Sequence, residues 1–236
     1  MLIAGNWKMN KTASETAEFC AQLKRRVDGL AGSVDISVFP PYTSLSAAVT
    51  GLADTEIAVG AQNVHWASEG AFTGEVSAPM LRELGAYAAI VGHSERRQQF
   101  GETDEMVARR ASAALEAGLF VIACVGELES EREAEETEAV LRRQVAVLSE
   151  DDRLVVAYEP VWAIGTGQTA TPDQAREAHA LIKELLDVPV LYGGSVTPGN
   201  AEELLAQDGV DGALVGGASL DLDSFAEICE LAATRS

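Results

Sequence analysis

LVVAYEPVWAIGTGQTATP, at residues 154–172, contains the signals of one strand, one loop and one helix start. Leu154–Tyr158 is a continuous apolar run, which is typical of a parallel strand buried on both faces. Thr171-Pro172 places a capping residue directly before a proline at the first helical position. The acidic residue Glu159 stands at the carboxyl end of the strand. The stretch therefore predicts a β-then-α unit with a polar group where the strand ends.

The same unit recurs along the chain. Eight such units without a long polar linker predict an α/β fold, a (β/α)8 barrel, more than an open doubly wound sheet, which usually has fewer strands. We expect residues 1–236 to form a single catalytic domain. The predicted strands are Leu2–Asn6, Ile36–Phe39, Ile57–Ala61, Ala88–Val91, Phe120–Val125, Leu154–Tyr158, Pro189–Tyr192 and Gly212–Val215.

Further helices are expected from cap residues and from the spacing of apolar residues. Ser14 is predicted to cap the first helix. Thr103 is predicted to begin another, which Gly118 closes. The charged stretch Ser130–Glu138 precedes apolar residues at helical spacing, so we interpret it as the exposed face of a helix.

Composition narrows the classes of partner and compartment. The net charge of −20 argues against a nucleic-acid partner, because the chain has no basic stripe to neutralise phosphates. This charge suits solubility through self-repulsion or adaptation to high salt, and composition does not choose between them. No apolar run reaches the roughly 18 residues of a membrane span, so no membrane partner is expected. Three scattered cysteines without CxxC spacing, and a start unlike a signal peptide, predict a cytoplasmic protein without a disulfide framework or zinc site.

Polar side chains of different chemistry follow three of the predicted strands. Asn6 and Lys8 follow the first, His93 the fourth and Glu159 the sixth. Since a barrel builds its active site at the carboxyl ends of its strands, we expect these groups to converge. Glu159 is either a general base under a closing loop or a carboxylate that caps a helix or pairs with an arginine. His93 precedes an expected helix start, which predicts a neutral imidazole with a pKa well below about 6.5.

Two glycine pairs follow the seventh and eighth strands. Gly193-Gly194 and Gly216-Gly217 would let the backbone bring N–H groups close to an anion, although tight turns also produce such pairs. We therefore expect a phosphate site here. GTGQTA at residues 165–170 matches a loose dinucleotide-binding pattern. It does not directly follow its strand, so we expect no nicotinamide site.

Five segments together resemble the triosephosphate isomerase family, in order and over essentially the whole chain. They are AGNWKMNK at 4–11, GHSERR at 92–97, AYEPVWAIGTG at 157–167, LYGGSV at 191–196 and DGALVGGA at 211–218. The resemblance implies an isomerase of glycolysis and gluconeogenesis that interconverts dihydroxyacetone phosphate and D-glyceraldehyde 3-phosphate through an enediolate. It also implies that neither a metal nor an organic cofactor is needed.

The resemblance also implies catalytic roles for five residues. Glu159 would move the proton between C1 and C2, and neutral His93 would polarise the carbonyl and the enediolate oxygens. Lys8 would stabilise the developing negative charge, Asn6 would orient the substrate, and Glu95 would support the lysine. The segment after Glu159 would close as a lid.

Phosphate binding and assembly are implied in the same way. Asn6 and Lys8 would bind substrate together with backbone around Gly165, Ser195, Gly216 and Gly217. Gln62–Pro79 is similar to the loop that joins two subunits in this family, which implies a homo-oligomer, with a homodimer expected. Thr73 would then lie near the partner's Asn6 and the partner's Glu95.

Two other functions fit parts of the sequence. Another phosphosugar isomerase, or a barrel lyase, could share the phosphate site, because a fold does not determine a reaction. It would not explain why Lys8, His93 and Glu159 occur together with the lid segment. A non-catalytic surface adhesin or binding module is the second alternative. No export signal favours it, and a coupled assay on both triose phosphates would separate all three.

Overall fold

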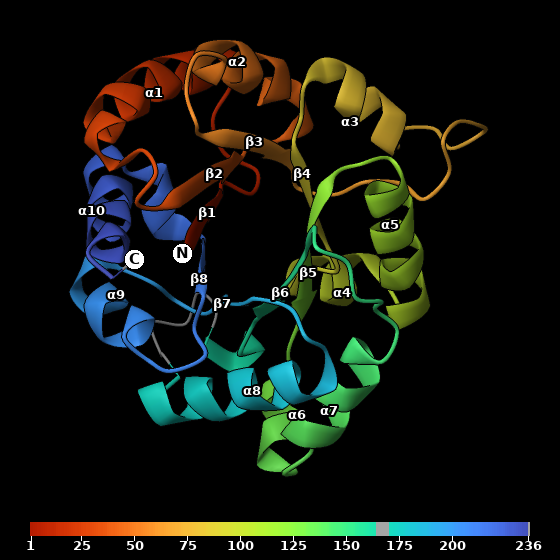
Figure 1. Ribbon diagram of the computed structural model, residues 1–236. Coiled ribbons are helices and arrows are strands. Elements are labelled where there is room, and N and C mark those ends of the chain that lie inside the picture. The colour runs from red at the N-terminus through yellow and green to blue at the C-terminus, as the bar shows by residue number, and fades with distance from the viewer. Residues whose placement is uncertain (164–169, 236) are drawn as a thin grey trace.

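The computed structural model describes residues 1–163 and 170–235, and it is a single-domain (β/α)8 barrel. Its strands are parallel and pair in chain order, and β1 closes the ring by pairing with β8. Leu2, at the start of β1, lies opposite Asp35 on one side and Gly212 on the other. Figure 1 shows the helices surrounding the ring of strands. The predicted fold class is confirmed.

All eight predicted strands are confirmed to within one residue at each end. Their apolar side chains face either the barrel axis or the surrounding helices, so each run is buried on both sides. The bounds are β1 (Leu2–Asn6), β2 (Asp35–Phe39), β3 (Ala58–Ala61), β4 (Ala88–Val91), β5 (Phe120–Val125), β6 (Leu154–Tyr158), β7 (Val190–Tyr192) and β8 (Gly212–Val215).

Helices follow the strands on the outside of the barrel (Figure 1). No helix among the described residues is long and apolar enough to cross a membrane. The α-helices are α1 (Ala13–Arg26), α2 (Tyr42–Leu52), α3 (Ala78–Leu84), α4 (Ser94–Phe100), α5 (Asp104–Glu116), α6 (Glu129–Glu133), α7 (Thr137–Val145), α8 (Pro172–Leu185), α9 (Pro198–Leu205) and α10 (Leu222–Ala233). Short 3-10 turns are η1 (Asp28–Leu30), η2 (Val161–Ala163) and η3 (Gly217–Leu220).

Two of the expected helix caps are confirmed, and one is wrong. The side chains of Thr103 and Thr171 accept backbone N–H groups at the starts of α5 and α8. Helix α1 is capped by Thr12, whose side chain accepts from the Glu15 N–H while the Glu15 carboxylate accepts from the Thr12 N–H. Ser14 therefore lies inside the helix, because the reciprocal Thr12–Glu15 pair satisfies two helix-end groups that serine alone would not.

The charged stretch after β5 has no buried residue, as predicted, but its helical structure is interrupted. Residues 130–138 do not form one helix but span the end of α6, a break and the start of α7. Glu135 lies in this break with a φ of 58°, in the left-handed region that ends helices. The apolar residues Val140, Leu141 and Val145 of α7 are buried, as their spacing predicted.

A separate layer of buried side chains fills the interior of the barrel. The ring of Phe39 lies directly against Gly60, where a Cβ would overlap the ring. Phe39, the last residue of β2, is therefore held inside the barrel by its contact with Gly60. A larger apolar layer separates the strands from the helices. Inside the barrel the buried side chains are those of Ala4, Phe39, Ala88, Ile90, Ile122, Cys124, Val155, Ala157, Leu191 and Leu214.

Candidate active site

Glu159 directly follows β6 and is buried, with 2 % of its surface exposed. Its Oε2 accepts a hydrogen bond from the Ser94 N–H at 2.8 Å, and its Oε1 lies 3.0 Å from Nε2 of His93. Burial raises the pKa of this carboxyl, but the His93 ring, the Ser94 N–H and the Lys8 ammonium lower it, and the net direction is downward. The buried carboxylate is therefore ionised near neutral pH.

His93 caps the start of α4. Its Nδ1 accepts the Glu95 N–H at 3.2 Å, so a neutral ring carries its proton on Nε2, facing Glu159. The predicted position at a helix start is confirmed. The predicted direction of the pKa is wrong: burial lowers the pKa of His93, but the charge of Glu159 raises it above its ordinary value. The sequence does not reveal that Glu159 lies in contact with the ring.

Lys8 follows β1 with a φ of 53°, a conformation that turns its side chain into the site. Its Nζ lies 2.6 Å from Oε1 of Glu95, the neighbour that the resemblance assigned to it. Its backbone N–H donates to Oδ1 of Asn6 at 3.1 Å, and its carbonyl accepts from Nε2 of Gln62 at 2.8 Å. These bonds fix an unusual backbone conformation from both sides.

A cavity of about 230 Å³ joins these groups at the carboxyl ends of the strands. It brings together seven of the predicted site residues. Glu95 is one layer away and reaches the cavity through Lys8. Gly165, the remaining predicted residue, lies outside the described residues, as does the second half of the predicted lid, residues 164–167. The cavity is lined by Asn6, Lys8, His93, Glu159, Gly193, Gly194, Ser195, Val196, Thr197, Leu214, Gly216, Gly217 and Ala218.

The glycines give the cavity its shape. A Cβ at Gly193 would lie 3.0 Å from Cγ of Glu159, and one at Gly216 would lie 3.6 Å from Cε of Lys8. Opposite them, the Ser195 hydroxyl donates to the carbonyl of Ala163 at 2.8 Å. This contact ties the loop after β7 to the turn after β6. At Gly216 and Gly217, which form the glycine end of the cavity, the backbone is thus open to a ligand, whereas Gly193 lies directly against Glu159.

Glu127 is a site-supporting residue that the sequence reasoning missed. It is fully buried after β5, and its Oε1 accepts from the Tyr158 hydroxyl at 3.1 Å, Nε1 of Trp162 at 3.0 Å and Arg132 at 3.0 Å. It therefore anchors the turn that follows Glu159. An acidic residue two positions after the end of a predicted strand was the available signal, similar to the one that singled out Glu159 directly after its strand.

The described residues contain no cluster of three His, Cys, Asp or Glu side chains that could hold a metal ion. The polar groups of the cavity consist of one carboxylate, one imidazole, one ammonium and several amides and hydroxyls. These groups can transfer protons and stabilise negative charge directly.

Comparisons with known proteins agree with this geometry. The family model described as "Triosephosphate isomerase" matches residues 1–232. A protein of that name from Solibacter usitatus is 53 % identical over 96 % of this chain and 97 % of its own length. Proteins of the same name from Rubrobacter xylanophilus and Picosynechococcus are each 49 % identical. They align with 98 % and 97 % of this chain, and with 96 % and 97 % of their own lengths.

Proposed function

The chain belongs to the triosephosphate isomerase family, and we propose that Glu159, His93 and Lys8 carry its reaction. The protein is an isomerase of glycolysis that interconverts dihydroxyacetone phosphate and D-glyceraldehyde 3-phosphate. The observation that supports the assignment is the contact between an ionised Glu159 and Nε2 of His93, in a glycine-lined cavity that also contains Lys8.

Glu159 is the base in this proposal. Its carboxylate removes a proton from C1 or C2 of the substrate and returns it to the neighbouring carbon. One carboxylate oxygen accepts from the Ser94 N–H and the other contacts His93. Substrate must displace these partners before Glu159 can reach a reacting carbon. Since the carboxylate is almost fully buried, it then acts without a competing shell of water.

His93 polarises the substrate oxygens. Once Glu159 turns toward carbon, the Nε2–H of His93 is free to donate to the carbonyl and then to the enediolate oxygen. The carboxylate that raises the His93 pKa then interacts with it less strongly, while burial and the Glu95 N–H still disfavour the cation. The proposal therefore uses a neutral imidazole during the reaction.

Lys8 and Asn6 stabilise and orient the substrate. The Lys8 ammonium, held by Glu95, supplies positive charge where the enediolate develops negative charge. Asn6 fixes the turn that carries Lys8. The phosphate is bound by backbone around Ser195, Gly216 and Gly217, and we propose that Gly165 and the lid segment complete this end.

A coupled assay tests the proposed site, with each triose phosphate supplied in turn. The expected result is turnover in both directions, with inorganic phosphate as a competitive inhibitor, because phosphate would occupy the glycine end. Turnover that is insensitive to phosphate would contradict this placement of the phosphate site. Activity only on a different phosphosugar would contradict the reaction itself.

We further propose that two copies assemble through the interface loop, residues 62–79. Figure 1 shows this loop extending between α3 and α5. Its tip exposes 44 % of Phe72, while the His65 ring packs on Phe72 with centroids 4.2 Å apart. Arg110 holds the base of the loop by donating to the Val64 carbonyl. A preshaped loop with an exposed aromatic residue suits a docking arm, because little order is lost on binding.

Replacing Thr73 at the exposed tip tests this assembly. Thr73→Arg would place a bulky charge in the closed interface, so we expect a monomer with at least a tenfold loss of activity. Sedimentation velocity measures the assembly, and Thr50→Arg on the exposed face of α2 is the matched control. An intact and active oligomer for Thr73→Arg would remove residues 62–79 from the interface.

We also propose a cytoplasmic location. The three cysteines, Cys20, Cys124 and Cys229, are all buried and free of disulfides, which suits a reducing compartment. Glycolytic substrates are also found there.

A further inference from the structure

A second cavity, of about 730 Å³, opens at the amino-terminal end of the barrel. It is lined by residues at or before the strand starts, such as Leu2 of β1, Asp35 of β2 and Phe120 of β5. The active-site cavity lies at the other ends of these strands. No residue named for the active site lines this second space.

Small side chains on neighbouring strands create the space. Ser37, Ala58 and Ala88 of β2, β3 and β4 line the cavity where larger residues would fill it. Phe39, whose ring lies against Gly60, also lines it. The cavity is separate from the active-site cavity, with which it shares no lining residue.

Its walls are apolar and partly aromatic. Leu2, Phe39, Phe120 and Ile122 line the interior. Tyr87 at the rim stacks on Phe120, with ring centroids 6.1 Å apart and an interplanar angle of 16°. Flat aromatic surfaces of this kind bind another ring or a cation well. The volume lies in the range of small-molecule sites, about 300–1,000 Å³.

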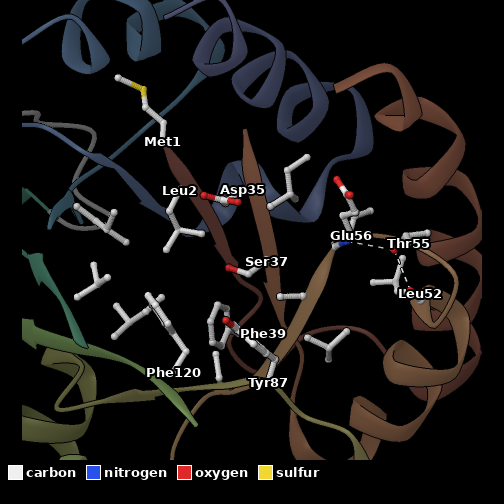
Figure 2. A pocket seen from close by; sticks show the side chains of 18 of the residues that line it. Met1, Leu2, Asp35, Ser37, Phe39, Leu52, Thr55, Glu56, Tyr87 and Phe120 are labelled. Atoms are coloured by element: carbon white, nitrogen blue, oxygen red, sulfur yellow. Dashed lines mark hydrogen bonds between the residues drawn. The ribbon is translucent and has the colours of Figure 1, made fainter. Parts of the chain in front are cut away.

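One polar side chain within the chamber has unused bonding capacity. Ser37 is 4 % exposed, and its Oγ has no hydrogen-bond partner among the described residues. Asp35 precedes it by two positions, so both side chains project from the same face of β2. Figure 2 shows both on the side of the strand that faces Leu2. The Asp35 carboxylate thus lies at the mouth of the cavity, and the Ser37 hydroxyl lies deeper on the same face of β2.

The charged side chains of the lining select one kind of ligand. They are Asp35, Glu56 and Asp211, and the Met1 α-ammonium is the one cationic group among the described lining residues, which include no Lys, Arg or His. Asp211 is already bound by Nζ of Lys183 at 2.7 Å and by the Val190 N–H. Asp35 and Glu56 have no ion-pair partner within the described part of the chain. The mouth therefore favours a cation over an anion.

We propose that this chamber binds a small aromatic amine in its protonated form. The ring lies between Phe39 and Phe120, an N–H of the ammonium donates to the Asp35 carboxylate, and a second donates to Ser37 Oγ. This site is independent of the proposed active-site roles, since it shares no residue with them.

Three probes of similar size and different charge test the proposal: phenethylammonium, 2-phenylethanol and phenylacetate. Binding to the wild-type protein is measured by titrating methyl NMR signals of Leu2 and Ile122, with Val196 in the active site as the internal control. We expect phenethylammonium to bind tightest and phenylacetate weakest. The Leu2 and Ile122 signals should shift while Val196 does not.

Variants distinguish the chamber from nonspecific attraction to an acidic protein. Asp35→Asn should weaken phenethylammonium binding about threefold without changing 2-phenylethanol binding, the range expected of an exposed ion pair. Glu129→Gln, at an exposed acid beyond the other strand ends, should change neither. Ala58→Leu should abolish binding of both by filling the chamber.

Two outcomes would overturn the proposal. One is equal affinity for the ammonium and the alcohol, which would remove the charge selection. The other is an equal loss of ammonium binding in Asp35→Asn and Glu129→Gln, which would show only a response to net charge. Asp35 is exposed, so this comparison stands even if Ala58→Leu fails to fold.

Discussion

The two ends of the barrel differ in how their polar groups are used. At the carboxyl end, Glu159, His93 and Lys8 each contact another ionisable group across a cavity of about 230 Å³. At the amino end the cavity is about 730 Å³, yet Ser37 has no partner there among the described residues. The larger cavity is therefore not the one whose ionisable groups interact with one another. Converging groups that shift one another's pKa mark the reactive end better than volume does.

The two longest connections of the barrel lie at the carboxyl ends of the strands. Connections from helix to strand range from residues 85–87, between α3 and β4, to residues 146–153, between α7 and β6. The connection after β3 runs from residue 62 to 77, and that after β6 to residue 171. Long segments can place polar groups over the barrel mouth, whereas three-residue connections can do little more than turn the chain.

The largest expected contrast between the ends is in catalysis. Glu159→Asp retracts the carboxylate by one methylene, and misplacement of about 1 Å can cost roughly 10²-fold in rate. We expect kcat to fall by that factor and KM to change far less, as measured by the coupled assay. Asp35→Asn removes a negative charge at the amino end of the barrel and should leave kcat within about twofold of the wild-type value. Near-parental kcat for Glu159→Asp would remove it from the mechanism.

A pair of glycines tests how tightly the carboxyl end is packed. A Cβ at Gly126 would overlap the carbonyl oxygen of Glu159, whereas a Cβ at Gly217 meets nothing within 4 Å. Gly126→Ala should therefore destabilise the fold by about 3 kcal/mol or more, the upper range for overpacking. Gly217→Ala should cost less than about 1 kcal/mol. Urea unfolding measures both, and equal costs would contradict the described packing.

Low pH should decrease the free energy of unfolding through His179. Burial lowers the pKa of His179 to about 4, and the ring lies between Tyr158 and Tyr192. Below about 6.5 the unfolded chain binds a proton that the folded chain does not, so stability is complete above that pH and falls as the pH drops toward 4. About 2 kcal/mol should be lost between pH 7 and pH 5.

The variant His179→Gln isolates this contribution, because other groups titrate equally in both proteins. Its free energy of unfolding, compared with that of the wild type at pH 5, 6 and 7, should show a flatter dependence on pH. Parallel curves would mean that His179 is not buried as a neutral ring.

The smallest expected effect is that of an amino-end substitution on catalysis at the carboxyl end. Ala58→Leu fills part of the larger cavity, which shares no lining residue with the active-site cavity, so kcat should stay within about twofold. Cavity filling commonly adds about 0.5–2 kcal/mol of stability, which thermal unfolding would detect. A large loss of kcat in a stable protein would show that the two ends are coupled through the barrel interior.

Local patterns predicted most of this architecture, because buried parallel strands leave continuous apolar runs and their ends carry the polar groups. Asn6, Lys8, His93, Glu159 and Ser195 line one cavity for that reason. Properties that depend on contacts across the barrel could not be predicted from local patterns, because these patterns do not show which distant residues meet.

The direction of the His93 pKa depends on a 3.0 Å contact with a residue 66 positions later in the chain. The role of Glu127 depends on three donors from separate segments. The amino-end cavity arises from small residues on three strands, and each of these residues is unremarkable in its own run.

The contact between the Phe39 ring and Gly60 has a consequence for the interior of the barrel. The ring keeps its place because residue 60 has no side chain, and it belongs to the buried layer of side chains inside the barrel. Any side chain at residue 60 would force the ring to shift and would disturb the packing of that layer. Members of the same layer line both cavities, Phe39 the amino-end one and Leu214 the active-site one, so one added methyl group could alter two sites that share no lining residue.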